Sequence, residues 1–227
     1  MFLIQSISMK TTNNYPWATH LKEEELDALM GSSVELEYDK FDVIIKQGSM
    51  ASQIMVLEEG MVKLNFQESG KDTTFGFGGK GDFIGLMCSF VKKRLDFSAV
   101  AITPCRIRIF DRDVFEKLIE HNGKFAIYIV TIMSQMIKET CHNLITLKHR
   151  NAGGSLATLL LNLVRVFGEH QIAIPFTREE MAHTLGYSKE SIINTLSDFQ
   201  KDNIISISGK NLEILDKKAL ENIAEKG

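Results

Sequence analysis

Residues 189–194 carry side chains whose types suit contacts with the bases of nucleic acid. In the major groove a carboxylate such as Glu190 can accept a hydrogen bond from cytosine N4, whereas Lys189 suits guanine or a phosphate. Asn194 could pair with adenine through two hydrogen bonds, and Ile193 could contact a thymine methyl group. We expect these four residues to read bases; a solvated helix surface is the alternative.

A second group of residues suits phosphate contacts, which position a protein on DNA without reading its sequence. Its members carry hydroxyl groups, positive charges or exposed backbone amides: Thr177, Arg178, Ser188, Ser191, Gly209 and Lys210. Residues 150–227 hold nine Lys or Arg and ten Asp or Glu, so the region is not basic overall. Few lysines imply weak non-specific binding and a shallow dependence on salt.

The stretch "HTLGYSKESIINTLSDF" at 183–199 indicates two helices with a sharp turn between them. Thr177 and Glu180 form a capping box at the start of the first helix. Gly186 ends that helix, since glycine adopts positive φ without strain, and Ser188 caps the second helix. This pattern is the helix-turn-helix signature. An ordinary helical hairpin is the alternative, but two β-rich runs at 203–215 suit a wing hairpin.

From 34 to about 111 the chain consists of short β-rich runs, and glycines recur about every ten residues. Such spacing is typical of an antiparallel sandwich or roll. A helix is predicted before it, at about 21–30, and another after it, at 114–121. None of the six histidines lies between 34 and 111, and no nucleophile or phosphate-loop motif occurs. The sequence therefore predicts neither an enzyme nor a metal site.

A long helix is predicted from Lys124 to about Lys148, because no Pro or Gly interrupts this stretch. Its apolar stripe predicts a coiled coil with a second copy of the chain, although packing on its own β domain is the alternative. The predicted interface residues are Phe125, Ile129, Ile132, Met136 and Leu144. "NAGG" at 151–154 reads as a hinge after this helix.

The predicted fold class is α+β, and four segments follow from these patterns. They are an N-terminal tail at 1–20, a jelly-roll-like β-roll sensor domain at 21–123, a dimerisation helix at 124–150 and a winged helix-turn-helix at 151–227. The 227 residues carry a net charge of −3, and no segment suits an export signal or a membrane span. We therefore expect a cytoplasmic chain. Its three widely spaced cysteines favour reduced thiols.

The order of these elements resembles the CRP/FNR family of bacterial transcription regulators from about 21 to 216. The most specific likenesses are "GDFIG" at 81–85, the long helix running into "LATLLLNLV", and "FTREEMAHTLGYSKESI". The resemblance implies a homodimer joined through residues 124–149, a pseudo-palindromic DNA site and contact with RNA polymerase. In that family the glutamate matching Glu190 reads a G·C pair. Cyclic-AMP-binding members have an arginine where this chain has Asn194, so its half-site should differ from theirs.

The sensor domain departs from the cyclic-AMP binders of the family. Those members follow their glycine with a glutamate for the ribose and use an Arg-Ser pair for the phosphate. The matching positions here are Gly85-Leu86 and Phe97-Ser98. Leucine cannot accept a hydrogen bond from a ribose hydroxyl and phenylalanine cannot neutralise a phosphate, so cyclic AMP is not expected to bind.

The positions of the cysteines indicate which other cofactors of the family this chain could bind. Its oxygen sensors hold an iron–sulfur cluster with four cysteines, three of them near the N-terminus, whereas no cysteine precedes Cys88 here. Cys105 matches the fourth ligand and suits a buried strand position. Cys141-His142 on the long helix leaves haem or thiol sensing open, with a surface or interface pair as the alternative. The effector, if a small molecule, stays unassigned.

The function predicted is that of a dimeric, sequence-specific DNA-binding transcription regulator that uses helix 188–199 for recognition. The alternative is a dimeric ligand-binding or scaffold module that has lost DNA binding, which the near-neutral winged domain favours.

Overall fold

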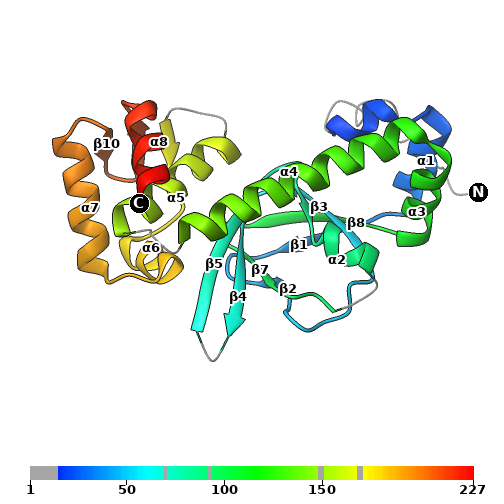
Figure 1. The fold of residues 1–227 in the computed structure, drawn as a ribbon, viewed down its shortest axis with the longest axis horizontal. Helices are drawn as coiled ribbons and strands as arrows, with labels where there is room; N and C mark the ends of the chain where they lie inside the picture. The colour runs from blue at the N-terminus through cyan, green and yellow to red at the C-terminus, as the bar shows by residue number, and fades with distance from the viewer. Residues whose placement is uncertain (1–14, 69–70, 92–93, 148–150, 168–170) are drawn as a thin grey trace, which may run out of the picture.

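The structure is a computed structural model that describes residues 15–68, 71–91, 94–147, 151–167 and 171–227 (Figure 1). Its N-terminal half contains two four-stranded antiparallel sheets, with strand orders β1-β8-β3-β6 and β2-β7-β4-β5. The strands are β1 (Val34–Tyr38), β2 (Val43–Ile45), β3 (Ile54–Glu59), β4 (Val62–Glu68), β5 (Lys71–Gly78), β6 (Phe83–Ile84), β7 (Ser98–Ala101) and β8 (Cys105–Phe110). The predicted antiparallel roll and the α+β class are confirmed.

The roll is held together by an apolar core between its two sheets. Leu57, Val62, Ala99 and Ile107 are fully buried there. Cys105 lies in the same core, where burial raises the pKa of its thiol. A buried thiol of this kind stays protonated and behaves as a small apolar side chain, as the sequence predicted for this position.

The tight turn between β3 and β4 depends on a glycine. Gly60 has φ of 91°, and a Cβ atom at this position would lie 2.3 Å from the carbonyl oxygen of Pro104. Both the backbone conformation and the space therefore require glycine. The short helix α2 (Leu86–Val91), which follows β6, was missed in the sequence, because a short apolar run fits a strand as well as a helix.

Three short helices flank one end of the roll: η2 (Pro16–His20), α1 (Glu23–Gly31) and α3 (Arg112–His121). Residues 15–20, which the sequence placed in a tail, pack against the domain instead. Tyr15 and Trp17 are buried and stacked, and the Trp17 ring meets the Phe110 ring edge-on. The rest of the predicted tail lies outside the described residues.

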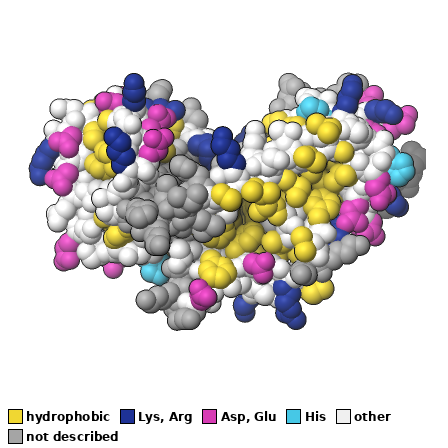
Figure 2. Space-filling view, viewed as in Figure 1, with side chains coloured by type: hydrophobic (Ala, Val, Ile, Leu, Met, Phe, Trp, Pro, Cys, Tyr) yellow, Lys and Arg dark blue, Asp and Glu magenta, His cyan; other side chains and the backbone are white. Residues whose placement is uncertain are grey.

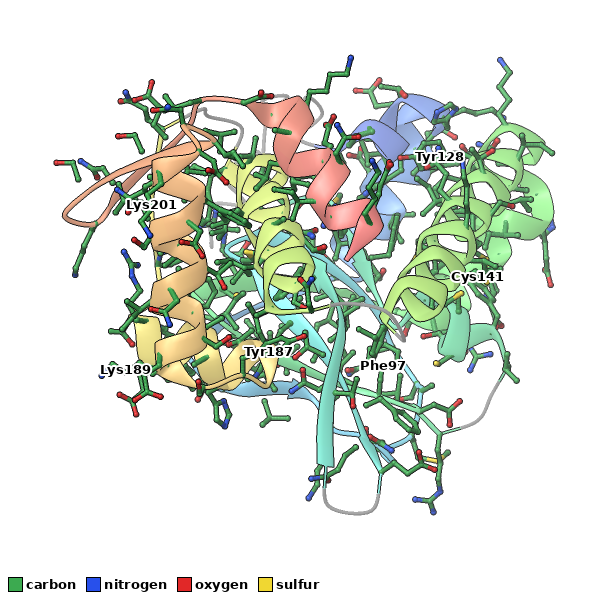
Figure 3. All side chains as sticks on the ribbon, turned by 60° about the vertical axis from the view of Figure 1, so that its left-hand side comes forward. Phe97, Tyr128, Cys141, Tyr187, Lys189 and Lys201 are labelled. Carbon is green, nitrogen blue, oxygen red and sulfur yellow. The ribbon has the colours of Figure 1, made fainter. Side chains whose placement is uncertain are left out.

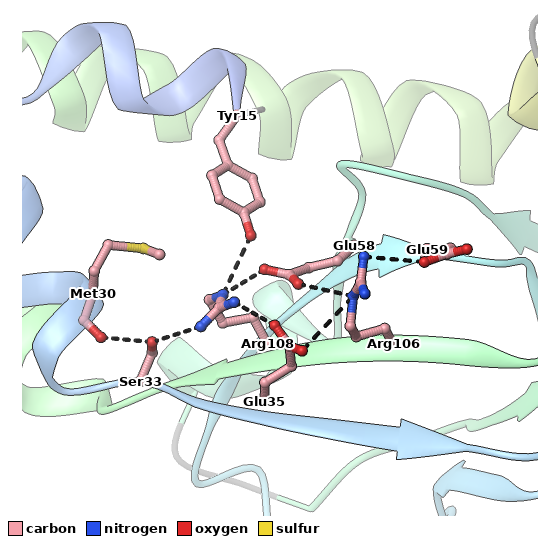
Figure 4. A network of polar contacts seen from close by, with 8 residues as sticks. All are labelled: Tyr15, Met30, Ser33, Glu35, Glu58, Glu59, Arg106 and Arg108. Carbon is pink, nitrogen blue, oxygen red and sulfur yellow. Dashed lines mark hydrogen bonds and ion pairs between the residues drawn. The ribbon is translucent and has the colours of Figure 1, made fainter. Parts of the chain in front are cut away.

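A polar network joins this N-terminal segment to the first sheet (Figure 4). Arg108 on β8 donates to the Tyr15 hydroxyl and pairs with Glu35 on β1 and Glu58 on β3. Arg106 pairs with the same two glutamates. Glu58 is almost enclosed, so its negative charge needs partners, and both arginines supply them. These ion pairs connect β1, β8 and β3 in their observed register.

The long helix α4 (Gly123–Leu147) runs from the roll to the C-terminal part of the chain (Figure 1). Phe125 and Ile129 are 0% and 2% exposed within the subunit, where the Phe125 ring meets that of Phe115. Ile132 packs against the same cluster. The predicted interface is therefore wrong at Phe125 and Ile129, because these residues pack on the chain's own domain. The side chain of Leu144 lies outside the described part.

The C-terminal part combines helices α5 (Ala152–Phe167), α6 (Arg178–Leu185), α7 (Lys189–Lys201) and α8 (Lys217–Lys226) with a three-stranded sheet. The strands, in the order β10-β11-β9, are β9 (Gln171–Ala173), β10 (Ile205–Ser208) and β11 (Asn211–Ile214). Within the ranges that the structure describes, no helix is long and apolar enough to cross a membrane.

The glycines of "NAGG" have a different role from the hinge that the sequence suggested. Both Gly153 and Gly154 lie in the first turn of α5, whose Gly154 amide donates to the side chain of Asn151. A Cβ at Gly154 would come within 2.7 Å of the Cα of Gly227. Glycine is therefore needed here because the end of the chain packs against the start of α5.

Candidate nucleic-acid interface

The turn between α6 and α7 is built by three local caps. The Glu180 amide donates to the Thr177 hydroxyl at 3.1 Å, and the Thr177 amide donates to the Glu180 carboxylate at 2.7 Å. Gly186 has φ of 76°, and the amides of Gly186 and Tyr187 both donate to Ala182. The Ser191 amide then donates to the Ser188 hydroxyl at 3.1 Å. These contacts fix the direction in which α7 leaves the turn.

Helix α7 has a buried face and an exposed face. Ile192, Leu196 and Phe199 are buried in the apolar core of the C-terminal part, together with Met181 of α6. The four residues predicted to read bases are all exposed: Lys189, Glu190, Ile193 and Asn194. An exposed Ile193, at 44%, beside a fully buried Ile192 shows how sharply the two faces are separated. Figure 3 shows Lys189 and Lys201 at opposite ends of α7.

The residues predicted to contact phosphates occupy two places. Four lie at the starts of the two helices, where backbone amides and the helix dipole favour anions: Thr177, Arg178, Ser188 and Ser191. The other two, Gly209 and Lys210, form the exposed turn between β10 and β11. Gly209 has φ of 61°, which suits the tight hairpin turn of a wing.

An acidic group, Glu179, also lies beside the exposed face of α7. Lys189 Nζ forms an ion pair with Glu179 Oε2 at 3.1 Å, and both side chains are well exposed. Such an exposed pair contributes little to stability, so Lys189 can exchange Glu179 for a phosphate or a base. No local pattern predicts this pair, since the two residues are ten positions apart.

The winged part is also held against the roll. Lys40 Nζ donates to the Pro175 carbonyl at 2.8 Å and pairs with Glu180 Oε1 at 2.9 Å. The Thr74 hydroxyl donates to the carbonyl of Thr184, at the end of α6. Met61 and Ile102 of the roll belong to the apolar core of the winged part. The helix-turn-helix is thus oriented by contacts with the roll near both ends of α6.

The Glu180 carboxyl links the capping box to the roll. Burial raises its pKa, but the hydrogen bond from Lys40, that from the Thr177 amide and the positive charge of Lys40 outweigh this effect, so its pKa lies below the ordinary value of 4.5. A carboxyl whose pKa is lowered by folding stabilises the fold above its unfolded pKa. That contribution is lost as the pH falls through the lowered value.

We therefore expect Glu180→Gln to lower the midpoint of thermal unfolding at about pH 7, and we expect this difference to shrink as the pH falls from 7 through the lowered pKa of Glu180, where the wild-type carboxyl also becomes protonated. Circular dichroism of both proteins across this range measures the difference. A difference that stays constant with pH would show that the charge of Glu180 does not matter.

An exposed apolar row runs along α4 on the face opposite Phe125. It consists of Ile127, Val130 and Ile137, which are 68%, 58% and 50% exposed, with Ser134 and Cys141 completing the spacing. Figure 2 shows hydrophobic side chains gathered over this helix. Gaps of three and four residues are those of a coiled-coil seam. This row is present in the sequence, but the interface was predicted from the second apolar stripe, which runs through Phe125 on the opposite face of α4.

Comparisons with known proteins agree with this architecture. The cyclic nucleotide-binding domain model matches residues 35–122, and the Crp-like helix-turn-helix domain model matches residues 154–223. The anaerobic regulatory protein of Haemophilus influenzae is 28% identical over 208 residues, which cover 88% of this chain and 80% of that protein. The CRP-like cAMP-activated global transcriptional regulator of Mycobacterium tuberculosis is 24% identical over 191 residues, which cover 82% and 85%.

A solved structure shows the same fold. FixK2 from Bradyrhizobium japonicum superimposes with a TM-score of 0.72 at 21% identity, over 84% of this chain and 96% of that one. The matched domains occur in the order in which the structure presents them, a β-roll followed by a winged helix-turn-helix. The chain therefore belongs to the CRP/FNR family and is a DNA-binding transcription regulator.

Proposed function

We propose that the protein binds a pseudo-palindromic DNA site as a homodimer and that the first turn of α7 enters the major groove. The observation that supports this proposal is that α7 has one buried and one exposed face. Ile192 is buried, whereas Glu190, Ile193 and Asn194 are exposed, close to the Ser188 cap at the start of the helix. Helix-turn-helix proteins place the N-terminal residues of this second helix against base edges.

Each exposed residue has a role in this proposal. Glu190 accepts a hydrogen bond from cytosine, Asn194 pairs with adenine, and Ile193 contacts a thymine methyl group. Lys189 binds guanine or a phosphate. The wing turn and the two helix N-termini hold the phosphates on either side.

The dimer forms through the exposed row of α4, in place of the residues that the sequence suggested. Ile127, Val130 and Ile137 would be covered by the same residues of a second chain, as an isologous interface requires. Ile132 and Met136 lie on the other side of the helix, where they line a cavity with the roll. The dimer acts in the cytoplasm, and contact with RNA polymerase follows from the family.

Glu190→Ala tests the base-reading role. We expect it to weaken binding to the selected site by about 1–3 kcal/mol and to relax preference at one base pair of each half-site. Selection from random DNA with both proteins, followed by affinity measurement at fixed salt, gives both quantities. Equal losses on every sequence would show that Glu190 does not read a base.

Lys210→Ala is the matched control, because Lys210 is exposed on the wing and its proposed contact is with a phosphate. It should weaken binding to all sequences alike and make the salt dependence shallower by about one unit of slope. An altered sequence preference in this variant would place the wing, and not α7, in the role of reader.

A second candidate function is a dimeric scaffold that does not bind DNA. The even balance of nine basic and ten acidic residues in 150–227 favours it, since DNA-binding domains usually carry an excess of basic residues. The same selection decides between the two, because a scaffold would enrich no palindrome even at low salt.

A further inference from the structure

Lys40 lies in the turn between β1 and β2, and its side chain reaches the winged part of the chain. Its Nζ donates to the Pro175 carbonyl at 2.8 Å and lies 2.9 Å from Glu180 Oε1. The same atom lies 5.7 Å from the centre of the Phe176 ring, which is buried in the core of the winged part. One side chain of the roll therefore contacts three residues around the start of α6.

The turn that presents Lys40 is closed by hydrogen bonds and contains an unfavourable backbone conformation. The Asp42 amide donates to the Asp39 carbonyl at 3.1 Å, and the Asp39 amide donates to the Asp42 carboxylate at 2.9 Å. The Phe41 amide donates to the Ala101 carbonyl, which ties the turn to β7. Phe41 has φ of 78°, a conformation that a bulky residue adopts only at a cost. Such strained residues are often found at functional contacts.

Phe41 contributes to the position of Lys40 in spite of this cost. Its ring is 56% exposed and gains little from burial, but its centre lies 4.8 Å from Lys40 Nζ. An aromatic face at this distance attracts an ammonium group, and the Phe176 ring attracts it from the winged part. The two rings and the Glu180 carboxylate thus favour one position of the Lys40 side chain.

The other end of α6 also contacts the roll. The Thr74 hydroxyl on β5 donates to the Thr184 carbonyl at 2.8 Å. Figure 1 shows α6 between the strands of the roll and α7. Because the Gly186 and Ser188 caps fix α7 to α6, the orientation of α7 relative to the roll depends on the contacts at both ends of α6.

In a dimer, the orientation of α7 sets the separation of the two recognition helices. A tilt of α6 would move the two α7 helices by equal amounts on opposite sides of the two-fold axis. One base pair occupies about 3.4 Å of the DNA axis, so a displacement of about 1.7 Å in each subunit corresponds to one base pair of half-site spacing. The caps of α7 would not change, so the bases read within each half-site would stay the same.

We propose that Lys40 is a positioning residue that selects the spacing between the two half-sites of the DNA, with Thr74 supporting it at the other end of α6. Lys40 acts through Glu180 and Pro175 and does not itself contact a base. The inference rests on the proposed function, because spacing has a meaning only for a dimer on paired half-sites.

The test uses the full chain and a DNA library in which half-sites selected by the wild type are separated by spacers of varied length. The wild type should enrich one spacer length. Lys40→Met keeps the length of the side chain but removes its charge, so its preference over neighbouring spacer lengths should fall by about threefold. Lys40→Arg keeps a positively charged donor and should restore the preference. Thr74→Val, which removes the hydroxyl, should broaden it.

Lys46→Met is the matched control. Lys46 is exposed on the same domain and takes part in none of these contacts, so this variant has the same loss of charge and should keep the wild-type spacing. A merely structural role of Lys40 would lower the midpoint of thermal unfolding, or the affinity for all spacers alike, and would leave the preferred spacing unchanged.

Unchanged spacing with Lys40→Met, or an equal change with Lys46→Met, overturns the proposal. So does a change with Thr74→Val alone, a failure of Lys40→Arg to restore the preference, or an altered base preference within a half-site. A wild type that binds paired half-sites at every spacing alike overturns this inference and leaves the proposed function intact. A wild type that enriches no paired half-sites overturns both.

Discussion

Replacing Val130 and Ile137 together by aspartate should convert a dimer into monomers. Both side chains are at least half exposed on one face of α4, so in a dimer they would be buried against a second copy. Two buried carboxylates per chain, facing their counterparts across the two-fold axis, would cost far more than such an interface gains. Sedimentation analysis measures the mass, and circular dichroism should show an intact fold.

The loss of the dimer should carry over to DNA binding. A monomer holds one half-site only, so affinity for the full palindrome should fall by about 100-fold or more. Thr131→Asp is the control, because Thr131 is exposed on the same helix but outside the apolar row. If the double variant stays dimeric, the copies associate through another surface. Phe125→Asp, in contrast, should unfold the roll, since Phe125 is fully buried within the subunit.

Ile192→Ala should lower the free energy of unfolding of the winged part by about 2–5 kcal/mol, whereas Ile193→Ala should change it by less than about 0.5 kcal/mol. The two residues are adjacent and chemically identical, but Ile192 is fully buried and Ile193 is 44% exposed. The first change leaves a cavity between α7 and α6, while the second removes only exposed surface.

Urea unfolding followed by the helical circular dichroism signal measures both changes. DNA binding adds a second comparison, because Ile193→Ala should weaken binding only to sites with thymine at the contacted position. Equal destabilisation by the two substitutions would mean that the buried and exposed faces of α7 have been assigned wrongly.

Local signals predicted the helix-turn-helix well. Thr177, Glu180, Gly186 and Ser188 form their caps from neighbours within four residues, so the chemistry that builds the turn is visible in a short stretch. The roll was predictable for a similar reason, since its turns recur at short intervals along the chain. The pattern of exposure on α7 then followed from helical periodicity alone.

The orientation of α4 could not be predicted in the same way. This helix has one apolar stripe through Phe125 and Ile132 and another through Ile127 and Ile137, and periodicity does not say which stripe faces the roll. Gly154 misled for a related reason, because its neighbour in the fold, Gly227, is remote in sequence.

The contacts between the two parts of the chain left no pattern in the sequence at all. Lys40 lies 140 positions before its partner Glu180, and Thr74 lies 110 positions before Thr184. The cavity between the roll and the winged part is built from such distant segments, so its lining appears only in the folded chain. Leu86 and Phe97 are the lining residues that the sequence already marked as unsuited to cyclic AMP.

Chemical footprinting with dimethyl sulfate on a selected DNA site tests most directly whether α7 reads bases in the major groove. The reagent methylates guanine N7 in the major groove and adenine N3 in the minor groove. For the wild-type protein we predict protection of guanine N7 in two half-sites whose centres lie about 34 Å apart. For Glu190→Ala we predict that this protection is lost at one position of each half-site. Bound DNA with every guanine N7 still reactive, or with protection confined to adenine N3, would contradict this account.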